Sequence, residues 1–189
     1  MSPSSPPSPS QLSVRPMDMD GAQLAVDYFH DATDEHLARM GVDRALLPGR
    51  EAWLRGFADD DRRPLGDRLS YGIVWELDGT VVGFSRTERI VLGQQAFMHL
   101  HILQLPDRRQ GHGARFVRLS AHHYFEVLGL QRLFCEPNAY NVAPNRTLQR
   151  AGFRYEMTHD DAPTPLNPYQ PLTRWSLERP ADLASLLTD

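Results

Sequence analysis

The residues with the clearest chemical potential form a run near the middle of the chain, Arg108-Arg109-Gln110-Gly111-His112-Gly113-Ala114. The run follows an apolar, strand-like segment over residues 97–105 and opens a helix-like segment. Glycines let the backbone approach an anion closely, and the first N–H groups of a helix are unpaired at the positive end of its dipole. The arginines can add charge-assisted hydrogen bonds. The run therefore predicts a binding site for a phosphate group, and an ordinary strand-to-helix turn is the alternative.

Histidine and glutamate side chains on the predicted strands could accept protons. His99 and His101 lie two residues apart, which puts both on one face of a strand, and an imidazole titrates close to neutral pH. His101 is the preferred general base or substrate-orienting residue, and Glu88 and Glu136, each at the end of another predicted strand, are alternative bases. The structural alternatives are a hydrogen-bonded strand histidine and solvated carboxylates. No further ligand is spaced to complete a metal site with the histidine pair, so no metal is expected.

The composition is that of an ordinary globular domain, with 41% hydrophobic and 23% charged residues in a chain of 189. All 20 basic residues are arginines, and 24 acidic residues give a net charge of −4, which favours neither nucleic acid nor an anionic membrane as a partner. The single cysteine, Cys135, excludes an intramolecular disulfide, and the cytoplasm is the expected location. No apolar run approaches the ~20 residues of a membrane span. Residues 1–10, rich in Ser and Pro, are expected to be a disordered tail before a single domain over residues 11–189.

The spacing of apolar residues divides the chain into helices and strands. Asp78-Gly79 indicates a hairpin turn, Asp20 can cap the first helix, and Gly41 can stop the second. Residues 59–64 are expected to form an exposed loop, and the long Pro-rich segment 160–171 is expected to be a binding loop. Helices are predicted over residues 20–29, 34–40, 50–57, 111–128, 141–150 and 181–187, and strands over residues 11–16, 69–77, 80–89, 96–105, 130–136, 153–157 and 172–177.

The order of these elements predicts an α/β domain of the α+β type. Three strands, over residues 69–77, 80–89 and 96–105, follow one another as an antiparallel meander. The long helix after Gly111 then joins the third of them to the strand over residues 130–136 in a β–α–β unit. We therefore expect a central, mixed but mostly antiparallel, twisted sheet of about six or seven strands with helices flanking it.

A second motif follows one β–α unit downstream, where Asn141 precedes Gly152-Phe153 by eleven residues. Together with the arginine–glycine run, it resembles the GNAT superfamily of acyl-CoA-dependent N-acyltransferases, in which a Gln/Arg-x-x-Gly-x-Gly/Ala turn binds the pyrophosphate of coenzyme A. The similarity covers about residues 12–177, and the order of the elements matches as well. Residues 141–153 look closest to the branch that holds the RimJ/RimL-type and the siderophore-type acyltransferases.

The resemblance implies the GNAT fold, acetyl-CoA as co-substrate and no metal. In this family the pantetheine arm of the cofactor pairs with a central strand at a splay in the sheet, which places contacts at Leu103 and Leu105 here. Asn141 and Asn145 would lie at the cofactor arm, although a plain helix N-cap is the alternative for Asn141. The pyrophosphate would be bound by Arg108, Arg109, Gln110, Gly111, His112, Gly113 and Ala114.

The implied reaction is direct attack of a primary amine on the acetyl thioester in a ternary complex. The Tyr that protonates the departing thiolate in many relatives would fall at Leu148 and is absent, so another group or water takes that role, or the step needs no dedicated acid. The acceptor is a small-molecule amine, a protein N-terminus or a hydroxylamine, and dimerisation, common in relatives, stays open. Two further hypotheses remain: a CoA-binding regulatory module without turnover, and an interaction domain whose glycine turn holds no cofactor.

Overall fold

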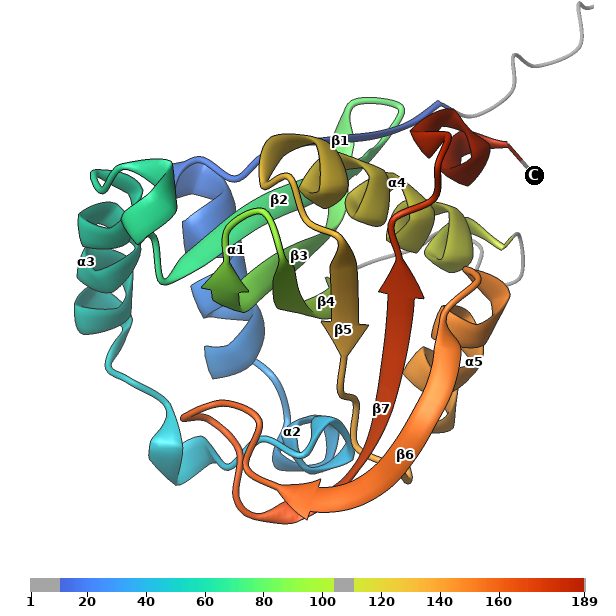
Figure 1. The fold of residues 1–189 in the computed structure, drawn as a ribbon. Helices are drawn as coiled ribbons and strands as arrows, with labels where there is room; N and C mark the ends of the chain where they lie inside the picture. Colours follow the sequence, from blue (N-terminus) through green and yellow to red (C-terminus); the bar gives the residue numbers. More distant parts are fainter. Residues whose placement is uncertain (1–10, 104–110, 189) are drawn as a thin grey trace, which may run out of the picture.

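The computed structural model of the protein describes residues 11–103 and 111–188. The disordered tail predicted for residues 1–10 lies outside the described residues, and so do the predicted cofactor contacts at Leu105, Arg108, Arg109 and Gln110. The described residues form one sheet with helices on both of its faces (Figure 1).

Seven strands form the sheet, in the order β1-β2-β3-β4-β5-β7-β6. Every neighbouring pair is antiparallel except β4 and β5, which run parallel and are joined through the long helix α4. The predicted mixed, mostly antiparallel sheet is therefore confirmed. The strands are β1 (Leu12–Pro16), β2 (Ser70–Leu77), β3 (Thr80–Val91), β4 (Gln95–Ile102), β5 (Arg132–Cys135), β6 (Arg154–Asp161) and β7 (Gln170–Glu178).

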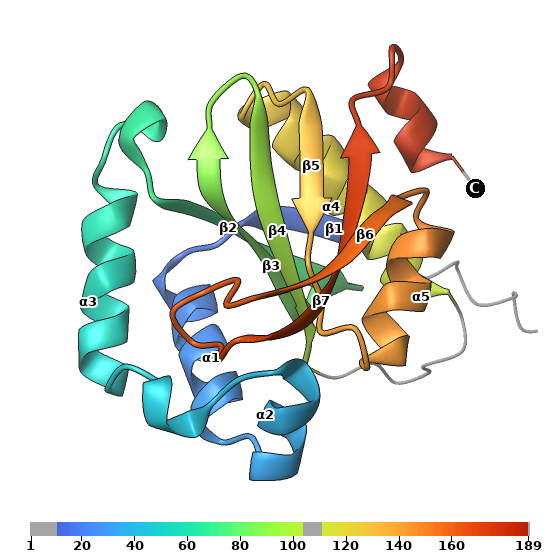
Figure 2. The same ribbon diagram turned by 60° about the horizontal axis from the view of Figure 1, so that its bottom comes forward.

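Helices cover both faces of the sheet (Figure 2). Each face buries its own apolar cluster. Neighbouring residues on a strand point to opposite faces. Phe84 of β3 accordingly packs against Phe29 of α1 on one face, whereas Ser85 accepts a hydrogen bond of 3.0 Å from Tyr124 of α4 on the other. The first face therefore belongs to α1, α2 and α3, and the second to α4 and α5. The helices are α1 (Met19–His30), α2 (Asp34–Met40), α3 (Arg50–Asp61), α4 (His112–Val127) and α5 (Val142–Arg150), with short 3₁₀ helices η1 (Arg44–Leu46), η2 (Leu65–Asp67) and η3 (Leu183–Leu187).

The turn signals of the sequence hold, with one shift at a helix start. Asp78 and Gly79 have φ angles of 51° and 76°, as the tight hairpin between β2 and β3 requires. Gly41 ends α2 with a φ of 73°. The first helix is capped by Asp18 and not by Asp20, because the Asp18 carboxylate accepts a hydrogen bond of 2.9 Å from the Gly21 N–H and so begins the helix earlier.

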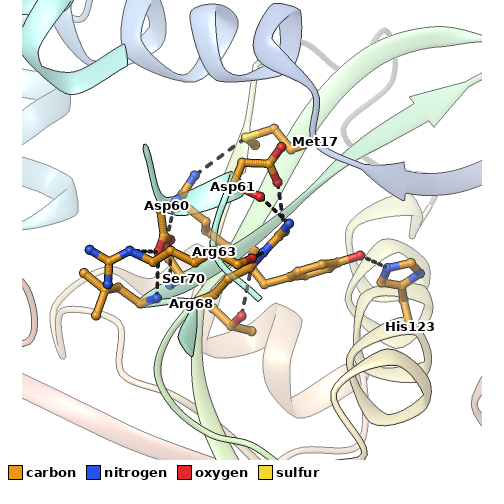
Figure 3. A network of polar contacts seen from close by, with 11 residues as sticks. Met17, Asp60, Asp61, Arg63, Arg68, Ser70 and His123 are labelled. Atoms are coloured by element: carbon orange, nitrogen blue, oxygen red, sulfur yellow. Dashed lines mark hydrogen bonds and ion pairs between the residues drawn. The ribbon is translucent and has the colours of Figure 1, made fainter. Parts of the chain in front are cut away.

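Helix α3 corrects the prediction of an exposed loop over residues 59–64, because it continues to Asp61. The side chain of Asp60 is buried and accepts hydrogen bonds from the N–H groups of Leu69 (2.8 Å) and Ser70 (3.0 Å) and from the Ser70 hydroxyl (2.7 Å) (Figure 3). These bonds tie the end of α3 to the start of β2. A carboxylate with several N–H and O–H partners can be buried at little cost, which an acidic run in a sequence does not reveal.

The loop between β6 and β7 is shorter than the predicted segment 160–171, because the two strands extend to Asp161 and from Gln170. The remaining connection, residues 162–169, is held at the end of α2. The Asp43 N–H donates to the carbonyl of Leu166 (3.0 Å), and the Asn167 side chain donates to the carbonyl of Gly41 (2.7 Å). The loop and α2 therefore form one continuous rim beside the first face of the sheet.

Candidate functional site

Strands β4 and β5 part from one another in the middle of the sheet. Only three residue pairs join them, from Gln95↔Arg132 to Phe97↔Phe134, and β4 then continues for five more residues to Ile102 (Figure 2). Beyond Phe97, no described strand pairs with this edge of β4. A central strand thus carries unpaired backbone groups, and such an edge can accept an extended ligand as an additional strand.

Hydrogen bonding on the other side of β4 shows which backbone groups face the gap. The N–H of Leu103 donates to the carbonyl of Val82 at 2.9 Å, toward β3. Because successive backbone groups alternate between the two neighbours of a strand, those of Ile102 and Leu100 point toward the gap. The N–H of Leu103, predicted to contact the cofactor, is therefore already used in the sheet, and the backbone groups that face the gap belong to Leu100 and Ile102, which sequence reasoning did not select.

Helix α4 begins at the far end of this edge. Gly111, the N-cap residue, has a φ of 75° and as a glycine offers no side chain to cap the helix, while the N–H groups of Ala114 and Arg115 bond to the carbonyl of Gly111. A methyl group on Gly113 would lie 3.9 Å from Ile102 Cδ1 of β4. The start of α4, with its outward-pointing N–H groups and the positive end of its dipole, therefore lies next to the end of the free edge.

Helix α5 lies beside the start of α4, with a methyl group on Gly113 reaching 3.5 Å from Thr147 Cγ2. Asn141 occupies the N-cap position of α5, but its side chain makes no capping hydrogen bond. Asn145 is fully engaged inside the protein: its amide donates to the carbonyl of Asn141 (2.8 Å) and accepts from Trp175 Nε1 (2.7 Å). Leu148 is completely buried in the core. As a leucine it has no hydroxyl group that could donate a proton.

His101 lies in an aromatic environment on the first face of the sheet. Its ring stacks on Phe84 with 4.8 Å between centroids and also contacts Phe29 (4.9 Å) and Tyr28 (5.4 Å). Burial, together with the nearby imidazoles of His99 and His36, lowers the pKa of His101 to about 3. The ring is therefore neutral at neutral pH and resists protonation, which disfavours it as a proton acceptor.

Glu88 and His99 form a polar pair one step further along the same face. His99 Nε2 lies 3.7 Å from Glu88 Oε2 and is buried without a hydrogen bond to any described residue. Burial raises the pKa of Glu88, but contact with His99 and the positive charges of Arg86 and Arg89 outweigh it, so the net pKa is below its usual range. Glu88 is therefore ionised at neutral pH, and its negative charge lies beside the His99 imidazole, an arrangement in which the imidazole can accept a proton from a bound group.

Glu136, the third predicted base, sits immediately after β5 with a side chain that is 0% exposed. Arg89 donates to its Oε2 at 2.7 Å and Arg174 to its Oε1 at 2.6 Å, and His159 Nε2 lies 3.3 Å from Oε1. Both carboxylate oxygens are thus held by guanidinium groups. The arginines come from strands 47 and 38 residues away in the chain, and sequence reasoning had no signal that would bring them together.

Two other kinds of chemistry find little support among the residues that the structure describes. No three His, Cys, Asp or Glu side chains converge to hold a metal ion. Burial raises the pKa of the Cys135 thiol to about 12, so it is no ready nucleophile.

None of the described helices combines the length and the apolar character needed to cross a membrane.

Comparison with known proteins gives a family match over most of the chain. Residues 12–154 match the family model described as an acetyltransferase (GNAT) domain. No curated protein sequence is a significant match.

Solved structures share the fold at low sequence identity. RimL, a ribosomal L7/L12 alpha-N-protein acetyltransferase solved with coenzyme A, is 14% identical over 90% of this chain and 96% of its own, with a TM-score of 0.70. Spermidine N-acetyltransferase from Vibrio cholerae, solved with CoA and spermine, is 14% identical over 94% and 99%, with a TM-score of 0.68. Ribosomal-protein-S5-alanine acetyltransferase from Vibrio fischeri is 16% identical over 90% and 94%, also with a TM-score of 0.68.

Proposed function

Because the chain belongs to the GNAT family of acetyltransferases, we propose that it transfers an acetyl group from acetyl-CoA to the nitrogen of a primary amine. The observation that carries the proposal is the edge of β4 that no described strand pairs with, which ends near the glycine N-cap of α4. An extended arm that ends in a pyrophosphate matches this sequence of features, because the edge offers strand-like pairing and the helix start offers N–H groups to an anion. RimL and spermidine N-acetyltransferase were both solved with coenzyme A.

In this proposal the backbone groups of Leu100 and Ile102 hold the pantetheine arm and leave a donor for the oxygen of the thioester. Asn141, at the start of α5, makes no capping bond with its side chain, and we propose that it contacts the cofactor arm. The pyrophosphate is bound by the turn that opens α4, for which we keep the predicted contacts Arg108, Arg109, Gln110, Gly111, His112, Gly113 and Ala114.

Glu88 and His99 are the groups we propose to take the proton from the attacking amine. An amine attacks a thioester only in its neutral form, so a nearby acceptor speeds the reaction by ~10²–10⁴-fold. The neutral ring of His101 would help to shape the pocket. Glu136 would hold the guanidinium groups of Arg89 and Arg174 in position. With Leu148 in place of a tyrosine, the departing thiolate would take its proton from water or from the substrate.

The acceptor is proposed to be a small-molecule amine. Among similar structures, one acts on spermidine and two modify ribosomal proteins, so a protein N-terminus is the alternative, and a hydroxylamine the next. We also propose a cytoplasmic location, supported by the single buried cysteine. The protein is proposed to act as a monomer or as a homodimer. A CoA-binding regulatory module without turnover is the second candidate function, favoured by the buried Leu148.

A turnover assay tests the proposal. The protein is incubated with acetyl-CoA and a panel of amines, and released CoA thiol and acetylated amine are both measured. We expect the two products in equal amounts, and a kcat at least tenfold lower in Glu88→Gln and in His99→Gln. His122→Gln, on α4 at the opposite face of the sheet, is the matched control and should keep wild-type rates. Binding of acetyl-CoA without any acetylated product would favour the regulatory module instead.

A further inference from the structure

A cluster of charged residues covers the place where β4 and β5 last pair. The rings of Phe97 and Phe134 stack there with 4.8 Å between centroids. The guanidinium of Arg89 lies 3.4 Å above the centroid of Phe97, and that of Arg174 lies 5.6 Å from the same ring. Phe97 shares its face of β4 with His99 and His101, so the arginines lie on the acceptor side of the proposed reaction.

One buried carboxylate holds two arginines in this cluster. The carboxylate of Glu136 accepts one bond from Arg89 and one from Arg174, so two cations share one anion. Arg86, the next cation, has carboxylates of its own, because Glu88, Asp60 and Asp61 all act on it. The two guanidinium groups that share Glu136 lie in a partly buried place, where an anion from outside would be attracted more strongly than in water.

The two arginines that hold Glu136 also keep donors for a ligand. Arg89 bonds through Nη2 and Arg174 through Nε, and the other guanidinium nitrogens of both have no acceptor among the described residues. Their side chains are 38% and 26% exposed, whereas Glu136 is 0% exposed. The carboxylate thus fixes the two guanidinium groups from below and leaves their outer N–H groups open to solvent.

The backbone at Arg89 is shaped to aim this side chain. Arg89 has a φ of 50°, in the left-handed region that side-chain-bearing residues seldom adopt, and the pairing of β3 with β4 shifts between Glu88 and Val91. Such a bulge turns a side chain away from its regular direction. Backbone strain of this kind is concentrated at ligand-binding positions.

We propose that the acceptor amine also carries a carboxylate, and that Arg89 and Arg174 bind that carboxylate. The inference rests on the proposed function and names the substrate class of the same site. The pair proposed to take the proton lies nearby: Glu88 pairs with Phe97, and His99 lies two residues further along β4, roughly 7 Å at strand spacing. The amine and the carboxylate are therefore close together in the substrate, as in a compact aminocarboxylate.

Matched pairs of acceptors test the inference. Each amino acid in the assay is compared with the amine that lacks only its carboxylate, such as tyrosine with tyramine and arginine with agmatine. A third series of amines carries a phosphate in place of the carboxylate, which separates a general preference for anions from a preference for the planar carboxylate. We expect kcat/KM to be about 10- to 100-fold higher for the carboxylate member of each pair, as one or two charge-assisted hydrogen bonds supply.

Variants assign the preference to the cluster. Arg174→Lys keeps a cation beside Glu136 but loses the planar fork, so it should fold and lose most of the preference for the carboxylate member of each pair. Arg89→Asn, with a residue that tolerates a positive φ, should do the same. Arg132→Gln is the control: Arg132 lies two residues before Phe134 on β5 but is paired with Glu178 at 2.5 Å, and its loss should leave the preference intact.

The outcomes separate this inference from the proposed function. Acetyl-CoA affinity is measured in parallel by calorimetry for each variant. Equal or reversed preference within the pairs, a preference that survives both arginine variants, or bound acetyl-CoA with no acceptor acetylated would overturn the inference while leaving cofactor binding in place. Failure to bind acetyl-CoA at all would remove the proposed function itself. A preference for phosphate amines over carboxylate amines would overturn the assignment to carboxylates.

Discussion

Replacing His101 with phenylalanine is expected to change the way in which the stability of the protein depends on pH. The His101 ring lies among Phe84, Phe29 and Tyr28, and burial lowers its pKa to about 3, well below the value of about 6.5 in an unfolded chain. His99, His36 and Glu88 are the titratable groups that act on it. A phenyl ring preserves the stacking geometry and removes the site of protonation.

The size of the effect follows from proton linkage. Between pH 6.5 and pH 3 the unfolded chain binds a proton at His101 that the folded protein does not bind, so stability is full above pH 6.5 and falls as the pH drops. Each pH unit in this window costs about 1.4 kcal/mol. From pH 7 to pH 5 His101 alone therefore removes about 2 kcal/mol of stability, which His101→Phe should not lose.

The assay is urea unfolding of wild type and His101→Phe at several pH values from 8 to 5. The free energy of unfolding of the wild type is subtracted from that of the variant at each pH, which cancels the contributions of the other titrating groups. At pH 8 the His101 ring is neutral in the folded and the unfolded state, so the difference there gives the effect of the substitution itself. We expect the variant to gain about 2 kcal/mol relative to wild type between pH 7 and pH 5. Two parallel curves would refute a His101 ring that stays neutral in the folded protein.

Three further substitutions are expected to separate binding from folding. Gly113→Asp should weaken acetyl-CoA binding by about 1–3 kcal/mol in a calorimetric titration, because it places a carboxylate against the pyrophosphate. The stability of the protein should be kept, since a Cβ meets only ordinary contacts at this position. Gly113→Ala is the control and should bind acetyl-CoA with nearly unchanged affinity. Asn145→Ala should lower the free energy of unfolding by about 1–3 kcal/mol, because it leaves Trp175 Nε1 unpaired, and an unchanged urea midpoint would contradict this. Glu136→Gln should cost about 1–3 kcal/mol, since it weakens the charge-assisted hydrogen bonds from Arg89 and Arg174; a melting temperature equal to that of wild type would count against these ion pairs.

The sequence predicted the elements well where local chemistry decides them. Asp78-Gly79 demands a hairpin and Gly41 a helix end, and both stand where expected with positive φ angles. The order of meander, long helix and parallel strand then left few alternatives for the sheet. Asp60 was misjudged because its hydrogen-bond partners, Leu69 and Ser70, are brought to it only by the packing of α3 on β2.

The candidate site was predictable at the glycine turn and far less so elsewhere. A phosphate-binding turn is formed by consecutive residues and can be recognised as a local motif. The environment of a base depends instead on residues that are distant in the sequence. His101 reads as an ordinary titrating histidine until Phe29 and Phe84 surround it. Glu136 reads as a solvated strand-end carboxylate until Arg89 and Arg174 close over it.

The account depends most directly on the binding of acetyl-CoA at the gap between β4 and β5. Calorimetric titration of the purified protein with acetyl-CoA, and with free CoA for comparison, measures it in a single experiment. We expect micromolar affinity for both, as the strand edge and the helix start contact parts that the two ligands share. Absence of binding by both would mean that the glycine turn is only structural, and it would contradict the proposed acetyl transfer.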